Sequence, residues 1–311
     1  MSPRPSYFRV FLTFIRNSLV RDMMFPTNFV IETVSSFGWV MMNIGFYLLI
    51  FTYTNRIQPA FAKGDIPTAV AKYYDIGREQ VTPELVERFH QEQQAAAWDE
   101  YQFFVFIATS MFINSIVQMF FMTNAEEFSE LIRTGGLDFA LLKPIDTQFL
   151  ISLRKVEWSS LANFLVAVAL MAYALPRVEG FVLTPWRVFA YLVYVAGGIG
   201  ILYSLTIVLA AASVWLGRNT SIYDFWFYIT TFSRYPMEIY QGPIGGWIRW
   251  GFTFVLPILI VVNVPARLLA KPMQPAYWYL AAFALVATAA SLAVSRWVFQ
   301  MSLVSYRSAS S

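Results

Sequence analysis

Long apolar stretches separated by shorter polar ones make up most of this chain. A helix needs about 20 predominantly apolar residues to cross a bilayer. Six stretches approach or exceed that length, and we predict that each forms a transmembrane helix: residues 29–54, 101–124, 157–176, 187–215, 219–241 and 275–301. The pattern therefore predicts an all-α integral membrane protein with six transmembrane helices.

The start of the chain shows a different, amphipathic pattern. Arg9 and Arg16 fall on one side of a predicted helix, and Phe8 falls elsewhere on it. Such a helix is typical of segments that lie in the membrane interface rather than across it. We predict a cytoplasmic interfacial helix within residues 1–27, followed by a single transmembrane domain over residues 28–311.

The charges of the connecting segments predict the orientation in the membrane. Residues 55–100 contain 5 Lys or Arg against 8 Asp or Glu, whereas residues 125–156 place basic side chains close to the ends of apolar stretches. Cytoplasmic loops are enriched in Lys and Arg. We therefore predict that residues 55–100 form an external loop, and that the N-terminus and residues 125–156 face the cytoplasm.

Residues 242–272 contain enough apolar residues to cross the membrane, but glycines and prolines interrupt them. If this segment spans the membrane, the C-terminus lies outside; if it is re-entrant, the C-terminus lies inside. Irregular backbone at membrane depth is tolerated where it is buried in protein or lines a cavity. We favour a re-entrant hairpin before the last transmembrane helix.

The stretch ELIRTGGLDFALLKPID, residues 130–146, interrupts the apolar pattern in the cytoplasmic loop. Gly135 and Gly136 end a first helical piece, because glycine permits the positive φ of a helix C-terminus. A second piece has leucines at helical spacing, and Lys143-Pro144 closes it, because the residue before proline disfavours the α region. The pattern predicts two short helices joined by a glycine hinge.

Composition supports a membrane protein and restricts its chemistry. The chain is 58% hydrophobic and 13% charged, whereas soluble domains carry about 25% charged residues. It has no cysteine, which excludes disulfides, thiolate nucleophiles and Cys-ligated metals. The single histidine, His90, leaves little scope for histidine-based metal or acid–base chemistry. We predict no catalytic, cofactor or metal site in this chain.

One charged cluster falls at the end of an apolar stretch. Arg234 and Glu238 are four residues apart, so on a helix they share a face and can pair. With Tyr235 and Pro236 they lie just before the predicted hairpin, where they could shape an outer gate. A structural ion pair that stabilises the break is favoured over direct contact with a transported molecule.

Four motifs in this order resemble those of type-2 permeases of bacterial ATP-binding-cassette exporters. The first follows the pattern R-x-G-x-L-D…L-x-P and comprises Arg133, Gly135, Leu137, Asp138, Leu142 and Pro144. The others are RYPMEIY at 234–240, VNVPARLL before the last apolar stretch, and SYRSAS at 305–310. The resemblance covers essentially the whole chain.

The resemblance implies a permease in the bacterial cytoplasmic (inner) membrane that exports an amphipathic or lipid-like substrate. Its partners would be an ATPase dimer that binds ATP and Mg, a second permease chain, identical or related, and membrane lipids, without nucleic acid. The absence of G-x-x-x-x-G-K-[ST] from this chain agrees with a separate ATPase.

The stretch at 130–146 then resembles the coupling element that docks into the ATPase. Asp138 and Lys143, five residues apart on one helix, would touch opposite walls of a cleft. The residues implied in coupling are Arg133, Gly135, Gly136, Leu137, Asp138, Leu141, Leu142, Lys143 and Pro144.

Two other classes remain as alternatives. A secondary transporter would need ionisable relays near mid-membrane, and the middles of the longest apolar stretches carry no charge. An integral-membrane lipid-modifying enzyme would need clustered His, Asp or Glu at one leaflet, and the carboxylates of this chain are scattered.

Overall fold

The computed structural model describes residues 6–53, 56–57, 65–74, 76–216, 221–240, 242–271 and 275–306. Among these residues, five helices are long and apolar enough to cross a membrane: Phe29–Thr52, Glu100–Arg133, Ser160–Arg177, Pro185–Leu216 and Tyr277–Ser305. They correspond to five of the six predicted spans, and they confirm an all-α integral membrane protein. The tail beyond Tyr306 and much of the start of the predicted external loop lie outside the described residues.

The remaining predicted span, residues 219–241, is not a continuous helix. α11 (Ser221–Thr231) is followed by two 3-10 turns, Phe232–Arg234 and Met237–Ile239. Between them Tyr235 is extended, with φ −123° and ψ 147°, because a residue that precedes proline is pushed out of the α region. The eleven residues of α11 cover about 16 Å, so a single transmembrane helix here was a wrong prediction.

The segment after it is a bent hairpin. α12 (Gly242–Trp250) and a π-helical turn (Gly251–Val255) lead to a break, after which α13 (Leu259–Ala270) begins. The two halves make an angle of 90°. Glu238, just before α12, pairs with Arg267 near the end of α13. The chain therefore enters and leaves this hairpin at the same end of the molecule, and that it is re-entrant in the membrane stays a prediction.

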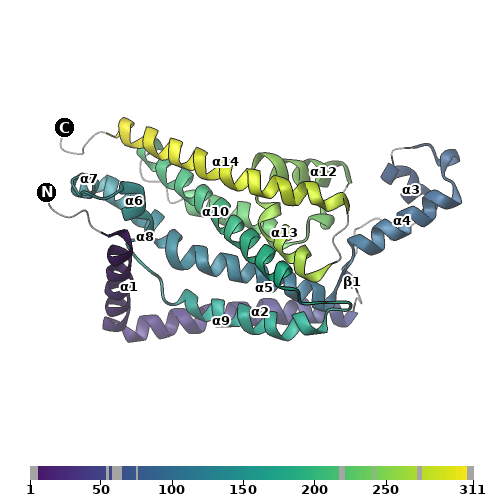
Figure 1. Ribbon diagram of the computed structural model, residues 1–311, viewed down its shortest axis with the longest axis horizontal. Helices are drawn as coiled ribbons and strands as arrows, with labels where there is room; N and C mark the ends of the chain where they lie inside the picture. The colour runs from purple at the N-terminus through teal and green to yellow at the C-terminus, as the bar shows by residue number, and fades with distance from the viewer. Residues whose placement is uncertain are drawn as a thin grey trace.

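The long helices run side by side along the longest axis of the molecule (Figure 1). They are α2 (Pro26–Tyr53), α5 (Glu100–Val117), α9 (Ser160–Ala174), α10 (Pro185–Leu216) and α14 (Pro275–Ser305). α5 continues through a π-helical turn (Gln118–Met122) into α6 (Thr123–Arg133). α1 (Tyr7–Met24) stands across the bundle at one end.

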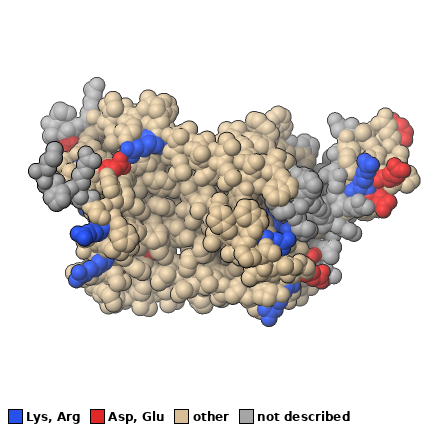
Figure 2. All heavy atoms as spheres, in the orientation of Figure 1, with Lys and Arg blue, Asp and Glu red and all other residues tan. Residues whose placement is uncertain are grey.

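The two ends of the bundle differ in what they carry. One end holds α1, the end of α14, α6, α7 (Gly136–Leu141) and α8 (Thr147–Leu153), and we call it the terminal end. The other carries α3 (Ile66–Tyr74), α4 (Pro83–Ala96) and the antiparallel strands β1 (Arg56–Ile57) and β2 (Trp98–Asp99), and we call it the arm end. Charged side chains gather at the two ends on the face shown in Figure 2, with an uncharged band between them.

The core of the bundle lies around α13. Every residue of that helix is buried, and it packs against α5 and α10. The approach to α10 is close at Gly198, where an added Cβ would lie 2.9 Å from the carbonyl oxygen of Val261. By contrast α2 is peripheral, because only 17% of its apolar window is buried. This leaves α2 as a loosely covered wall of the bundle.

Candidate functional site

The glycine hinge lies between α6 and α7 at the terminal end. α6 ends at Arg133, and Gly135 has φ +71°, the left-handed conformation that the pattern predicts. Gly136 has no positive φ and begins α7 instead. A Cβ at that position would lie 2.9 Å from the Leu131 Cδ2 atom, which can shift because it ends a flexible side chain. Only Gly135 therefore requires glycine for its backbone conformation.

The short helix α7 has one buried side and one exposed side. Leu137 and Ala140 are buried and pack in a cluster with Phe128. Phe139 is 74% exposed and Leu142 is 81% exposed. Leu137, one of the residues implied in coupling, is therefore not on the surface and anchors α7 to the rest of the chain. Sequence reasoning missed Phe139, although its place two residues after Leu137 puts it on the other side of the helix.

The polar residues of this stretch are also arranged differently from the prediction. Asp138 is half-buried, and together with burial its charge raises the pKa of the Tyr306 hydroxyl. Lys143 is exposed but lies beyond the end of α7, so the two residues do not share one helix. The exposed Arg133 pairs with Glu130, at 2.9 Å between Nε and Oε2. Leu141 and Pro144 are exposed as well.

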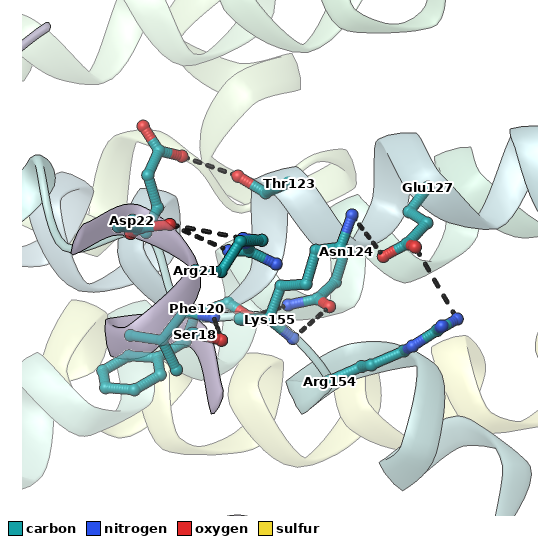
Figure 3. A network of polar contacts seen from close by, with 11 residues as sticks. Ser18, Arg21, Asp22, Phe120, Thr123, Asn124, Glu127, Arg154 and Lys155 are labelled. Atoms are coloured by element: carbon teal, nitrogen blue, oxygen red, sulfur yellow. Dashed lines mark hydrogen bonds and ion pairs between the residues drawn. The ribbon is translucent and has the colours of Figure 1, made fainter. Parts of the chain in front are cut away.

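A buried asparagine fastens the segment after α8 to α6 (Figure 3). The Asn124 Nδ2 donates to the carbonyl oxygen of Lys155 at 2.7 Å, and the Asn124 Oδ1 accepts from the Lys155 N–H at 2.8 Å. The same amide donates to the carbonyl oxygen of Phe120 at 2.8 Å. Because one side chain satisfies both polar groups of a neighbouring backbone unit, it fixes the position of that unit.

Neighbouring contacts extend this attachment to α1 (Figure 3). The Ser18 hydroxyl, buried in α1, accepts from the Val156 N–H at 3.0 Å. Glu127 lies 3.0 Å from the Lys155 Nζ and 3.6 Å from an Arg154 nitrogen. Three segments that are far apart in sequence are thus joined at one point.

A second attachment joins α8 to the last transmembrane helix. Asp146 accepts from the Phe149 N–H at 3.0 Å, which caps α8, and it accepts from the Arg296 Nη1 of α14 at 3.0 Å. The Arg296 guanidinium holds the pKa of the Asp146 carboxyl below its ordinary value. The capping role could have been read from an aspartate before TQF, but its ion pair with α14 could not.

The predicted outer-gate residues separate at the arm end. Glu238 is buried, pairs with Arg267, and accepts a hydrogen bond from the Trp98 Nε1 at 3.0 Å. The predicted ion pair between Arg234 and Glu238 is wrong, because the helix ends at Arg234 and the extended Tyr235 turns the two side chains apart. The pair is replaced by one that spans 29 residues of sequence.

Arg234, Tyr235 and Pro236 take no part in the Glu238–Arg267 ion pair. The Arg234 guanidinium lies 5.0 Å from the centre of the Phe227 ring. Tyr235 is exposed and Pro236 is buried at the turn. The arrangement therefore splits the predicted gate into a buried ion pair and a separate arginine.

Comparison with models of protein families gives a match over most of the chain. The family model described as ABC-2 family transporter protein matches residues 86–310, which is more than half of the chain. The comparisons with curated proteins and with solved structures gave no match.

We predict that Asn124→Ala causes a large loss of stability for a single substitution. The change leaves the N–H and C=O of Lys155 without partners, and each unsatisfied buried group costs about 1–3 kcal/mol. The control is Asn43→Ala, since the Asn43 Nδ2 donates only to the Trp39 carbonyl of its own helix. Thermal unfolding in detergent should show a clear fall in Tm for Asn124→Ala and little change for Asn43→Ala. Equal Tm values for the two variants would contradict the role of Asn124.

Proposed function

The chain belongs to the ABC-2 family of transporter proteins, and from this premise we propose that it is the permease subunit of an ATP-driven exporter. Hydrolysis would take place on separate ATP-binding-cassette subunits that bind ATP and Mg. A second permease chain, identical or related, would complete the membrane part. In this proposal the terminal end faces the bacterial cytoplasm and the arm end faces outward.

The observation that carries this proposal is the two-sided structure of α7. Its buried side holds the helix against α6, α8 and α14, while Phe139 and Leu142 project from the other side. Large apolar side chains of this kind are typical anchors of protein interfaces. The exposed Lys143 and the Glu130–Arg133 pair provide polar groups around them.

The attachments of the loop supply a route from this surface into the membrane. A rigid element transmits a displacement, whereas a freely moving loop would absorb it. In the proposed mechanism a push on α7 reaches α14 through the Asp146–Arg296 pair and reaches α6 and α5 through Asn124. α14 and α5 both pack against neighbours that continue to the arm end, α10 and α13. ATPase closure would thus move two transmembrane helices together.

We predict that Phe139→Asp and Leu142→Asp abolish co-purification of the ATPase. Each change places a charge in the apolar contact, and an unpaired charge that becomes buried typically costs about 3–5 kcal/mol. Val182→Asp is the control, because Val182 is 60% exposed but lies in the loop before α10 at the arm end. The measurement is the amount of ATPase recovered with tagged permease. Normal recovery with both α7 variants would exclude this surface as the docking site.

We predict that Gly135→Val uncouples hydrolysis from export, and that Gly180→Val does not. Both glycines have a left-handed backbone, with φ +71° and +69°, and forcing a side chain there costs on the order of 1–3 kcal/mol. The two variants should therefore lose similar thermal stability. Only Gly135 orients α7, so only its variant should show a reduced ratio of export to ATP hydrolysis in reconstituted vesicles. A similar reduction in both variants would mean that strain alone, not hinge position, causes the loss.

A further inference from the structure

A cavity of about 150 Å³ lies between α2, α5 and α9, at the depth of the membrane. Its wall combines apolar side chains with an unusual number of polar ones. The polar residues are Asn43, Ser110, Asn114, Ser115, Gln118, Asn163 and Arg234. Ser110 and Gln118 are eight residues apart on continuous helix, so the polar lining extends about 12 Å along the membrane normal. Polar groups at this depth are costly and usually serve a function.

The charge of this cavity comes from Arg234. The side chain is half-buried and stacks near Phe227. Among the described residues, no Asp or Glu lies within ion-pair distance of it, since Glu238 pairs with Arg267 instead. An arginine inside the membrane is normally stabilised by an acidic partner or by a polar cavity. Arg234 therefore offers a positive charge to whatever enters this cavity, and no described Asp or Glu pairs with it.

The amides of the cavity can bind a polar group beside that charge. Asn43 and Asn114 each donate to a backbone carbonyl four residues earlier, at 2.7 and 2.8 Å. The Asn114 Nδ2 also donates to the Ser110 Oγ at 3.4 Å, whereas Asn43 still has a second N–H and a carbonyl oxygen. The Asn163 Oδ1 is buried and has no hydrogen-bond partner. Buried polar atoms without partners are rare and call for a missing partner.

The cavity borders a surface suited to a hydrocarbon chain. Trp39, which lines the cavity, is 54% exposed, and Met42 and Phe46 on the same helix are 58% and 57% exposed. An acyl chain could lie along α2 while its headgroup occupies the cavity. The Tyr47 ring, also in the wall, contacts Phe103 near the start of α5 at 5.0 Å between centroids, so Arg234 beside it lies toward the arm end.

We propose that this cavity binds the anionic headgroup of an amphipathic molecule, with Arg234 as the counter-charge. The headgroup carries a phosphate or carboxylate, and its hydrocarbon chain lies against α2. That this class of molecule is the exported substrate rests on the proposed function.

The test uses single cysteines, because the chain has none of its own. Met111→Cys reports on the cavity, because Met111 lines its wall. Phe189→Cys reports on a surface away from α2, because Phe189 lies in α10 and is 58% exposed. Membranes containing the full chain are treated with a membrane-permeant maleimide in the presence of dodecyl phosphate, dodecyltrimethylammonium or inorganic phosphate. We expect dodecyl phosphate alone to slow the labelling of Met111→Cys, and none of the three to slow the labelling of Phe189→Cys.

The charge is tested by combining Met111→Cys with changes at two arginines. Arg234→Gln should raise the concentration of dodecyl phosphate needed for half protection by about tenfold or more, whereas Arg234→Lys should retain most of the protection. Arg177→Gln is the matched control, since Arg177 also lies over an aromatic ring, 4.1 Å from the centre of the Tyr173 ring, but is outside the cavity. Unchanged labelling of Phe189→Cys in each background shows that the fold is intact.

Three results would overturn the proposal. The cavity cysteine could be protected from labelling by dodecyltrimethylammonium as well as by dodecyl phosphate, or by inorganic phosphate as well as by dodecyl phosphate. In the third, dodecyl phosphate would protect it fully in the Arg234→Gln background. The labelling assay measures binding to the permease alone. If the ATPase failed to bind, the proposed function would be refuted, but the labelling result would still test the proposed headgroup site. In the reconstituted complex, dodecyl phosphate should also stimulate ATP hydrolysis, and stimulation should be lost in Arg234→Gln. Protection without stimulation would refute the substrate assignment.

Discussion

The Asn124 side chain makes two hydrogen bonds with the backbone of Lys155, and the packing of the helices at the terminal end depends on this contact. In a low-dielectric interior such bonds are strong, and their loss is costly. They hold the segment after α8 against α6. The adjacent Val156 N–H donates a hydrogen bond to Ser18 of α1 and so attaches α1 to the same segment. Without this point of attachment, α7 would sit on a loop that could move independently of the membrane helices.

The two ends of the molecule solve different physical problems. At the terminal end, polar contacts bind separate segments into one block and leave an apolar tip uncovered. At the arm end, the buried Glu238–Arg267 ion pair joins the two ends of the hairpin, and Trp98 donates a hydrogen bond to Glu238. Nearby, the Lys271 Nζ donates to the Ala97 carbonyl at 2.7 Å. The cavity beside Arg234 lies in the membrane between these ends. A displacement that starts at α7 would therefore pass this cavity before it reaches the hairpin.

Local sequence patterns were sufficient for features that depend on neighbouring residues. Apolar run length identified five spans, and the glycine pair located the turn at Gly135. Periodicity could not reveal that Leu137 faces inward, because both sides of a short helix carry apolar residues. Nor could it find the partner of Glu238, since Arg267 is distant in sequence and the helical face assumed for Arg234 ends at Tyr235. Contacts between segments decided these cases.

In the proposed mechanism the exposed tip of α7 contacts the ATPase, and a site-specific photo-crosslink can detect that contact. A photoreactive amino acid is placed at Leu142, with the exposed Leu183 at the arm end as the control. Irradiation of intact cells should join the Leu142 variant to an ATP-binding-cassette subunit, identified by mass spectrometry, and should not do so for the Leu183 variant. If the Leu142 variant crosslinks only to lipid or to another permease chain, α7 is not the coupling element and the account is wrong.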